Sequence, residues 1–259
     1  MPRWGFSSSP LIEGNQLFVE VGGVNGKFIA AFDKRNGDVL WSSHTGKLGY
    51  ASPIAVTIGG ERQLIVFAGH RLLSVSTDNG ELLWSYPWRT GRYDVHAATP
   101  IFIAPDKIYI SSAYGKEAAV LQVKVTDSPE SSVLNNIEVE EIWKNERMQN
   151  RLATSVLYDN HLYGFHRTIL KCIDASTGVE KWKTRGFGEG TLMLADGHLI
   201  ILGDRGTLGL VEATPSAYHE AASAEVLSGL CWTVPTLANG KLYARNEKEM
   251  VCLDMTGQN

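Results

Sequence analysis

A short phrase recurs along the chain, and it limits the possible folds more than any other feature. Each copy has an Asn-Gly or Thr-Gly pair followed by a run of residues that ends in tryptophan. The three clearest copies are DKRNGDVLW (33–41), STDNGELLW (76–84) and DASTGVEKW (174–182). Glycine in these pairs supplies the positive φ of a tight turn, so each phrase predicts two strands joined as a hairpin. Self-similarity of this kind indicates a repeat architecture.

Two more strands are predicted before each hairpin. Every unit opens with small residues and an apolar segment, as in YASPIAV (50–56) and LATSVLY (152–158), and a second short strand follows after a turn. Four short strands in about 40 to 50 residues are typical of a propeller blade. The sequence therefore predicts an all-β protein, a β-propeller of four-stranded antiparallel blades, with about six blades present.

The predicted repeat units form a single domain that covers residues 1–259. Their approximate ranges are 7–48, 49–94, 95–149, 150–187, 188–229 and 230–259. The third unit is the longest, because a polar segment (126–140) is inserted between its third and fourth strands. We expect this insertion to form an exposed hairpin or loop.

The repeated tryptophans are interpreted as structural residues that cover the seams between neighbouring blades. They are Trp41, Trp84, Trp143 and Trp182. Cys172 and Cys252 share a third-strand position with Ala31 and Ser74, which indicates a tight core position and unreactive thiols.

Aspartates recur where the turns begin, at positions 33, 174 and 254. Their carboxylates are expected to accept hydrogen bonds from backbone N–H groups in the turns that follow.

The recurring phrase resembles the repeat of pyrroloquinoline-quinone (PQQ) type β-propellers, whose signature is A-x-D-x-x-T-G-x-x-x-W. CIDASTGVEKW (172–182) matches this signature closely, and AFDKRNGDVLW (31–41) and SVSTDNGELLW (74–84) match it well. Within that superfamily the chain is most similar to PQQ-binding-like or BamB-like repeat proteins of bacteria, and the resemblance covers essentially the whole chain.

The resemblance implies an eight-bladed ring and an exported protein, in the periplasm or outside the cell. This chain has six units, and its last unit ends at CLDMTGQN without a fourth strand. One interpretation is that two further blades and an export signal lie upstream; the alternative is a six-bladed ring closed in another way. An open ring would expose strand edges, through which the chain could self-associate.

The charge, the apolar runs and the cysteines of the sequence exclude several kinds of partner. The net charge is −4 and the isoelectric point is about 6.0, which gives no basic field for nucleic acid. No apolar run is long enough to cross a membrane. The three cysteines are too few and too scattered for a disulfide framework, and no His/Cys cluster has zinc spacing. A protein partner or a small ligand is therefore expected.

The segments that lead into the innermost strands of a propeller converge at one end of its central channel. Residues three or four before each strand are therefore candidate ligand contacts: Phe6, Tyr50, His96, Arg151, Glu189 and Trp232. Such a mixture of aromatic and charged groups could form a pocket for a small molecule or peptide. The alternative is a solvated rim with no dedicated ligand. Asp94 and His96 are also candidates for proton transfer.

The resemblance also raises the possibility of a PQQ-dependent dehydrogenase. That chemistry would need a calcium ion held by carboxylate and amide oxygens, a catalytic aspartate, a stacking tryptophan and usually an adjacent cysteine pair. The sequence has no Cys-Cys pair and no evident set of calcium ligands. Glycoside hydrolysis would instead need paired carboxylates facing one pocket.

We therefore expect no catalytic residues, no metal site and no cofactor. The favoured function is a non-catalytic binding or scaffold module that presents its loop faces and channel mouth to a protein or small ligand, in the cell envelope as the resemblance implies. The alternative is a quinoprotein-type oxidoreductase with part of its active site in missing blades.

Overall fold

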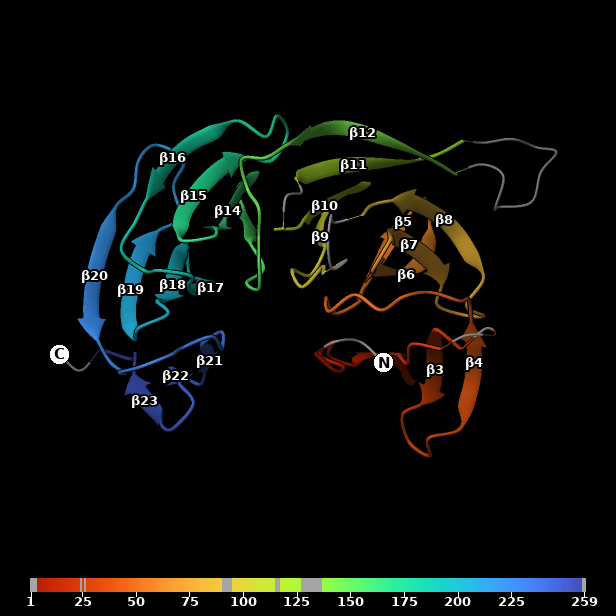
Figure 1. The fold of residues 1–259 in the computed structure, drawn as a ribbon, viewed down its shortest axis with the longest axis horizontal. Coiled ribbons are helices and arrows are strands. Elements are labelled where there is room, and N and C mark those ends of the chain that lie inside the picture. The colour runs from red at the N-terminus through yellow and green to blue at the C-terminus, as the bar shows by residue number, and fades with distance from the viewer. Residues whose placement is uncertain are drawn as a thin grey trace. The chain divides into compact units, whose positions relative to one another are not determined.

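The computed structural model describes residues 4–23, 25, 27–89, 95–114, 117–126 and 137–257. In these residues the secondary structure consists of strands, turns and bends, without a helix (Figure 1). Consecutive strands pair antiparallel into small sheets. The chain divides into two compact units, residues 1–146 and 147–259, and each is described by itself.

Unit 1 contains three four-stranded sheets. The first is formed by β1 (Leu11–Glu13), β2 (Gln16–Glu20), β3 (Ile29–Asp33) and β4 (Val39–Ser43). The second is formed by β5 (Ile54–Ile58), β6 (Glu61–Ala68), β7 (Arg71–Ser76) and β8 (Leu82–Pro87). The third is formed by β9 (Ile101–Ile103), β10 (Lys107–Ser111), β11 (Ala118–Val125) and β12 (Ile137–Asn145).

Unit 2 contains two four-stranded sheets and one of three strands. The first is formed by β13 (Val156–Tyr158), β14 (His161–His166), β15 (Ile169–Asp174) and β16 (Glu180–Thr184). The second is formed by β17 (Thr191–Ala195), β18 (His198–Leu202), β19 (Thr207–Glu212) and β20 (Glu220–Glu225). The third is formed by β21 (Thr236–Ala238), β22 (Lys241–Arg245) and β23 (Met250–Asp254).

Each sheet is built from strands of one predicted repeat unit. The predicted insertion lengthens the hairpin of β11 and β12, and residues 127–136 within it lie outside the described residues. The predicted turns between third and fourth strands are confirmed, because Gly37, Gly80 and Gly178 have φ values of 79°, 73° and 66°. These values lie in the left-handed region that glycine adopts without steric cost.

The aspartates bond as expected in these turns. Asp33 Oδ1 accepts a bond from Arg35 N at 2.8 Å, Asp174 Oδ1 from Ser176 N at 2.9 Å, and Asp254 Oδ1 from Thr256 N at 2.9 Å. The side chain of Arg35 also bonds to the Asp33 carboxylate and lowers its pKa to about 2.

Two of the repeated tryptophans bond to the neighbouring sheet of their unit, and a third bonds within its own sheet. Trp41 Nε1 on β4 donates to Thr77 O beyond β7 at 3.0 Å, and Trp182 Nε1 on β16 donates to Thr214 O beyond β19 at 2.7 Å. Trp84 is 5% exposed, and its Nε1 donates to Gln63 Oε1 at 2.9 Å. The interpretation of the four tryptophans as structural residues stays a prediction, which the bonds of Trp41 and Trp182 to neighbouring sheets support.

The hydrophobic cores lie between consecutive sheets. In unit 1 one core joins the sheets β1–β4 and β5–β8, and another joins β5–β8 and β9–β12. In unit 2 the larger core joins β13–β16 and β17–β20, and a smaller one joins β17–β20 to the last sheet. Among the described residues, no helix is long and apolar enough to cross a membrane.

The two cysteines at the shared third-strand position differ. Cys172 is fully buried opposite Trp182, and burial raises the pKa of its thiol to about 11. Cys252 is exposed, so the prediction of a tight core position is wrong for this residue. The physical reason is that β23 is the edge of a three-stranded sheet, where no described fourth strand covers it.

Candidate functional site

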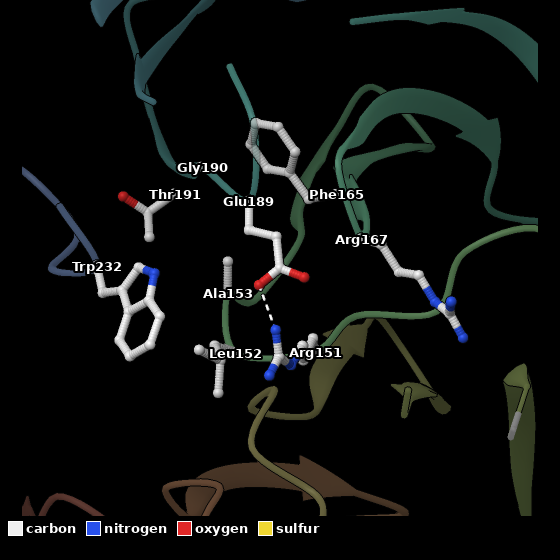
Figure 2. A pocket seen from close by; sticks show the side chains of 9 residues that line it. All are labelled: Arg151, Leu152, Ala153, Phe165, Arg167, Glu189, Gly190, Thr191 and Trp232. Carbon is white, nitrogen blue, oxygen red and sulfur yellow. Dashed lines mark hydrogen bonds and ion pairs between the residues drawn. The ribbon is translucent and has the colours of Figure 1, made fainter. Parts of the chain in front are cut away.

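A small cavity in unit 2 brings together three of the residues that the sequence singled out. Arg151 precedes β13, Glu189 precedes β17 and Trp232 precedes β21, so each belongs to a segment that leads into the first strand of a sheet. Figure 2 shows the three side chains around one opening, with Glu189 and Arg151 pointing toward each other. The cavity volume is about 20 Å³, little more than one water-sized sphere. A larger ligand would therefore rest across the opening instead of being enclosed.

An ion pair forms the polar side of this opening. Arg151 Nη1 donates to Glu189 Oε2 at 2.5 Å, and the two side chains are 41% and 24% exposed. At this exposure the pair contributes at most about 1 kcal/mol to stability, so its main effect is to orient the two groups. The guanidinium retains further N–H groups with which it can bond a ligand.

The backbone around Glu189 is closely constrained. Glu189 N donates to Asp204 Oδ2 at 3.0 Å. Gly188 has a φ of +59°, and a Cβ atom there would lie 2.1 Å from Asp204 Oδ1. Gly190 is also tight, since its Cβ atom would lie 2.9 Å from the ring of Phe165. Glycines on both sides thus allow Asp204 and Phe165 to fix the position of Glu189.

Apolar side chains form the other side of the opening. Trp232 is 52% exposed and Leu152 is 42% exposed, whereas Phe165 beneath them is buried. Thr191 Oγ1 donates to Thr233 O at 3.3 Å, which anchors the segment that carries Trp232. The arrangement is a partly exposed indole beside a charged pair, a combination enriched in binding surfaces.

The other three sequence candidates lie in unit 1. Phe6 is 57% exposed. The ring of Tyr50 makes an edge contact with Trp4, at 5.8 Å between ring centroids, and Tyr50 N donates to His96 O at 2.8 Å. The segments before β1, β5 and β9 therefore lie side by side in this unit.

The side chain of His96 is interior. Its ring is fully buried and stacks on Phe67 at a centroid distance of 4.3 Å. Nε2 lies 3.1 Å from Gly69 O, to which it donates, and Nδ1 lies 2.8 Å from Ser112 Oγ. The ring therefore packs in the core of unit 1 and offers no surface to a ligand. Asp94, its suggested partner in proton transfer, lies outside the described residues.

Sequence reasoning missed the apolar residues of the unit 2 opening. Leu152 directly follows a selected residue, and its exposure is not encoded in the repeat phrase. Phe165 is the last residue but one of β14, and Arg167, at a φ of 55°, lies in the turn to β15. Figure 2 shows the Arg167 guanidinium directed away from Trp232. Because Phe165 lies near the end of the second strand of its sheet, beside this opening, its position could have marked it as a lining residue.

The groups at this opening can hydrogen-bond to a ligand and pack against it. Among its nine lining residues Glu189 is the one carboxylate, whereas glycoside hydrolysis needs two. Within the described ranges no group of three or more His, Cys, Asp or Glu side chains is placed to hold a metal ion. Since Glu189 is already paired with Arg151 and the chain has no adjacent cysteine pair, these residues do not fit a calcium–quinone site.

Comparisons with known proteins agree with the predicted family and fold. A family model described as outer membrane protein assembly factor BamB matches residues 3–184. BamB from Moraxella catarrhalis is similar in structure, with a TM-score of 0.67 and 15% sequence identity over 94% of this chain and 70% of that chain. The computationally designed Ika8 protein has a TM-score of 0.64 and 13% identity, over 92% of this chain and 67% of that one. The curated proteins gave no significant match.

At these identities the structural likeness establishes the fold. The antiparallel sheets are propeller blades, and the described residues form five sheets of four strands and one of three, so about six blades are present, as the sequence predicted.

Proposed function

This chain belongs to the family described as outer membrane protein assembly factor BamB, and from that premise we propose that it is a non-catalytic binding module of the bacterial cell envelope. Its role would be to hold a protein involved in the assembly of outer membrane proteins. The contact surface would be the opening in unit 2, which we call the Trp232 mouth: Arg151, Leu152, Glu189 and Trp232.

The observation that carries this proposal is the exposure of apolar groups around a fixed charged pair. Trp232 and Leu152 expose about half of their surfaces, and Val234, two residues further on, is 45% exposed. Tryptophan and arginine are the residues that most often dominate the energy of protein interfaces. A flat surface of this kind suits a protein segment better than a small molecule, because the cavity itself is too small to enclose one.

A binding role needs no catalytic group from this surface. The carboxylate of Glu189 is held by Arg151, and the floor consists of Phe165, Ala153 and Thr191. Our proposal includes no cofactor. A thermal melt with PQQ and calcium checks this directly, since a ligand at about one hundred times its dissociation constant would add about 2.7 kcal/mol to stability. We expect no shift in the melting temperature; a clear upward shift would favour the quinoprotein function.

The function is tested in the host bacterium by replacing the gene with variants. Trp232→Ala should lower the amount of folded outer membrane proteins, because truncation of a central interface tryptophan typically costs about 2–4 kcal/mol of binding. Met250→Ala is the matched control, since Met250 is an apolar residue of the same unit and is 66% exposed. Both variants must accumulate to the level of the wild-type protein. If deletion of the whole gene leaves outer membrane protein levels unchanged, the proposal is wrong.

A further inference from the structure

A second, larger cavity in unit 2 lies at one end of the sheet β13–β16. Its volume is about 440 Å³, within the range of small-molecule sites. The residues that line it come from the turn between β14 and β15 and from the end of β16: His166, Ile169, Lys171, Lys183, Thr184 and Arg185. The sheet register explains this gathering, because His166 pairs with Ile169 and Leu170 pairs with Thr184.

Positive charge exceeds negative charge around this cavity. Lys171 Nζ lies 2.9 Å from a Glu180 oxygen, and Lys183 Nζ lies 3.2 Å from the other oxygen of the same carboxylate. Arg185 is exposed and has no ion pair within the part of the chain that the structure describes. Among the lining residues and Glu180, three cations and one carboxylate leave a surplus of two positive charges. Arg167, next to His166, adds to the positive charge on this side.

The lining cations differ in how firmly they are held. The side chain of Lys171 is 10% exposed, and its Nζ also donates to Arg147 O at 2.7 Å. The side chain of Lys183 is 62% exposed. Lys171 therefore provides a fixed positive charge at the inner end of the cavity. The side chains of Lys183 and Arg185 are exposed, so they can change rotamer to contact a ligand.

His166 adds a neutral hydrogen-bond donor. Its Nδ1 accepts a bond from Gln149 N at 3.2 Å, so the proton of the neutral ring is on Nε2. Burial, followed by the charges of Lys171 and Arg167, lowers the pKa of this imidazole. The ring can therefore donate through Nε2 without adding a further cation.

We propose that this cavity binds a phosphate monoester group. A phosphate dianion matches the surplus of two positive charges, and its oxygens accept the forked N–H groups of arginine and the point charge of lysine. A single carboxylate would leave one positive charge unbalanced. The cavity is larger than a phosphate, so the ester group has room beside Ile169 and Thr184. This site involves none of the residues of the Trp232 mouth, and its test is independent of the function proposed above.

The test is calorimetric titration of the whole chain with inorganic phosphate and with glycerol phosphate, at constant ionic strength set with chloride. We expect a dissociation constant on the order of 1 mM or lower for at least one of these probes, and about tenfold weaker binding in Lys183→Gln and in Arg185→Gln. Lys181→Gln is the matched control, because Lys181 is on the same strand but pairs with Asp174 at 3.3 Å. Its affinity should stay within about twofold of the wild type.

A second experiment distinguishes a phosphate group on a lipid from one on a soluble ligand. Vesicles containing phosphatidic acid are sedimented with the wild type and with the double variant Lys183→Gln/Arg185→Gln. Selective loss of sedimentation in the double variant, without binding of the soluble probes, would identify a lipid headgroup as the source; binding of the soluble probes would identify a free ligand. The proposal is overturned if neither probe nor vesicle binds, or if all three single variants weaken binding equally, since that is the result of general charge screening.

Discussion

At the scale of single residues, most buried polar groups of the described structure have hydrogen-bond partners, but a few, including the carboxylate of Glu20, have none. The carboxylate oxygens of Glu20, at the end of β2, are buried and have no hydrogen-bond partner. Burial raises the pKa of Glu20 to about 8, because the charged form loses its hydration. His96 and Trp84 are equally buried, but each has bonded polar atoms.

The raised pKa of Glu20 makes stability depend on pH. Between the ordinary value of 4.5 and about 8 the folded state binds more protons than the unfolded state, so stability falls as pH rises through this window. The full effect is on the order of 5 kcal/mol, and local opening of the first sheet would reduce it. Denaturant unfolding at pH 5 and pH 8.5 measures it in the wild type and in Glu20→Gln. The variant should lose much less stability between the two pH values; equal losses would contradict the assignment to Glu20.

Truncation of two tryptophans should lower stability to different extents. Trp84→Ala removes a buried ring and a bond to Gln63, so we expect a loss of about 3–5 kcal/mol in the free energy of unfolding. Trp232→Ala removes a ring that is 52% exposed and should cost about 1 kcal/mol or less. Urea denaturation midpoints compare the two variants. A loss of several kcal/mol in Trp232→Ala would make this residue part of the core and remove it from the proposed binding surface.

At the scale of the elements, the hairpin phrase specifies more than the turn itself. A bulge follows the third-strand residue that faces each repeated tryptophan, for example between Ala31 and Phe32 and between Cys172 and Ile173. The glycine of the next turn then approaches the ring of the preceding sheet, since a Cβ atom at Gly80 would lie 2.5 Å from Trp41. The turn of one sheet and the tryptophan of its neighbour therefore fit together.

Two turn glycines test this fit. Gly37 and Gly80 have nearly the same φ, but a Cβ atom at Gly37 would meet nothing within 4 Å. Gly37→Ala should cost only the backbone strain of the left-handed region, about 1–2 kcal/mol. Gly80→Ala must also displace Trp41, which should add about 1–3 kcal/mol. Equal losses in the free energy of unfolding would show that the turn and Trp41 do not fit closely.

At the scale of the whole molecule, the strand order could be predicted from the sequence, because the repeat phrase has turn glycines and core residues at fixed positions. The phrase weakens after Trp182: β20 reads EAASAE and has no tryptophan. The family match likewise ends at residue 184, whereas the sheets β17–β20 and β21–β23 continue the same antiparallel order. In β17–β23 the fold is therefore maintained by strand pairing and by the alternation of apolar residues, although the repeat phrase is no longer recognisable there.

The candidate site was less predictable, because a position before a strand does not determine where its side chain points. Arg151, Glu189 and Trp232 reach one opening, but His96, chosen by the same rule, is buried because Phe67, Gly69 and Ser112 provide its packing and bonding partners. The charge surplus beside β16 was also not evident, since Lys171 and Lys183 become neighbours only through the register of β15 with β16.

The most direct measurement of the central claim is site-specific photo-cross-linking in the host bacterium. A photoreactive residue at Leu152, which lines the Trp232 mouth, is compared with one at Met250 on β23. Our account predicts a discrete adduct with a protein of the outer membrane assembly process from position 152, its loss in Trp232→Ala, and no such adduct from position 250. Equal adducts from both positions, or an adduct that persists without Trp232, would contradict it.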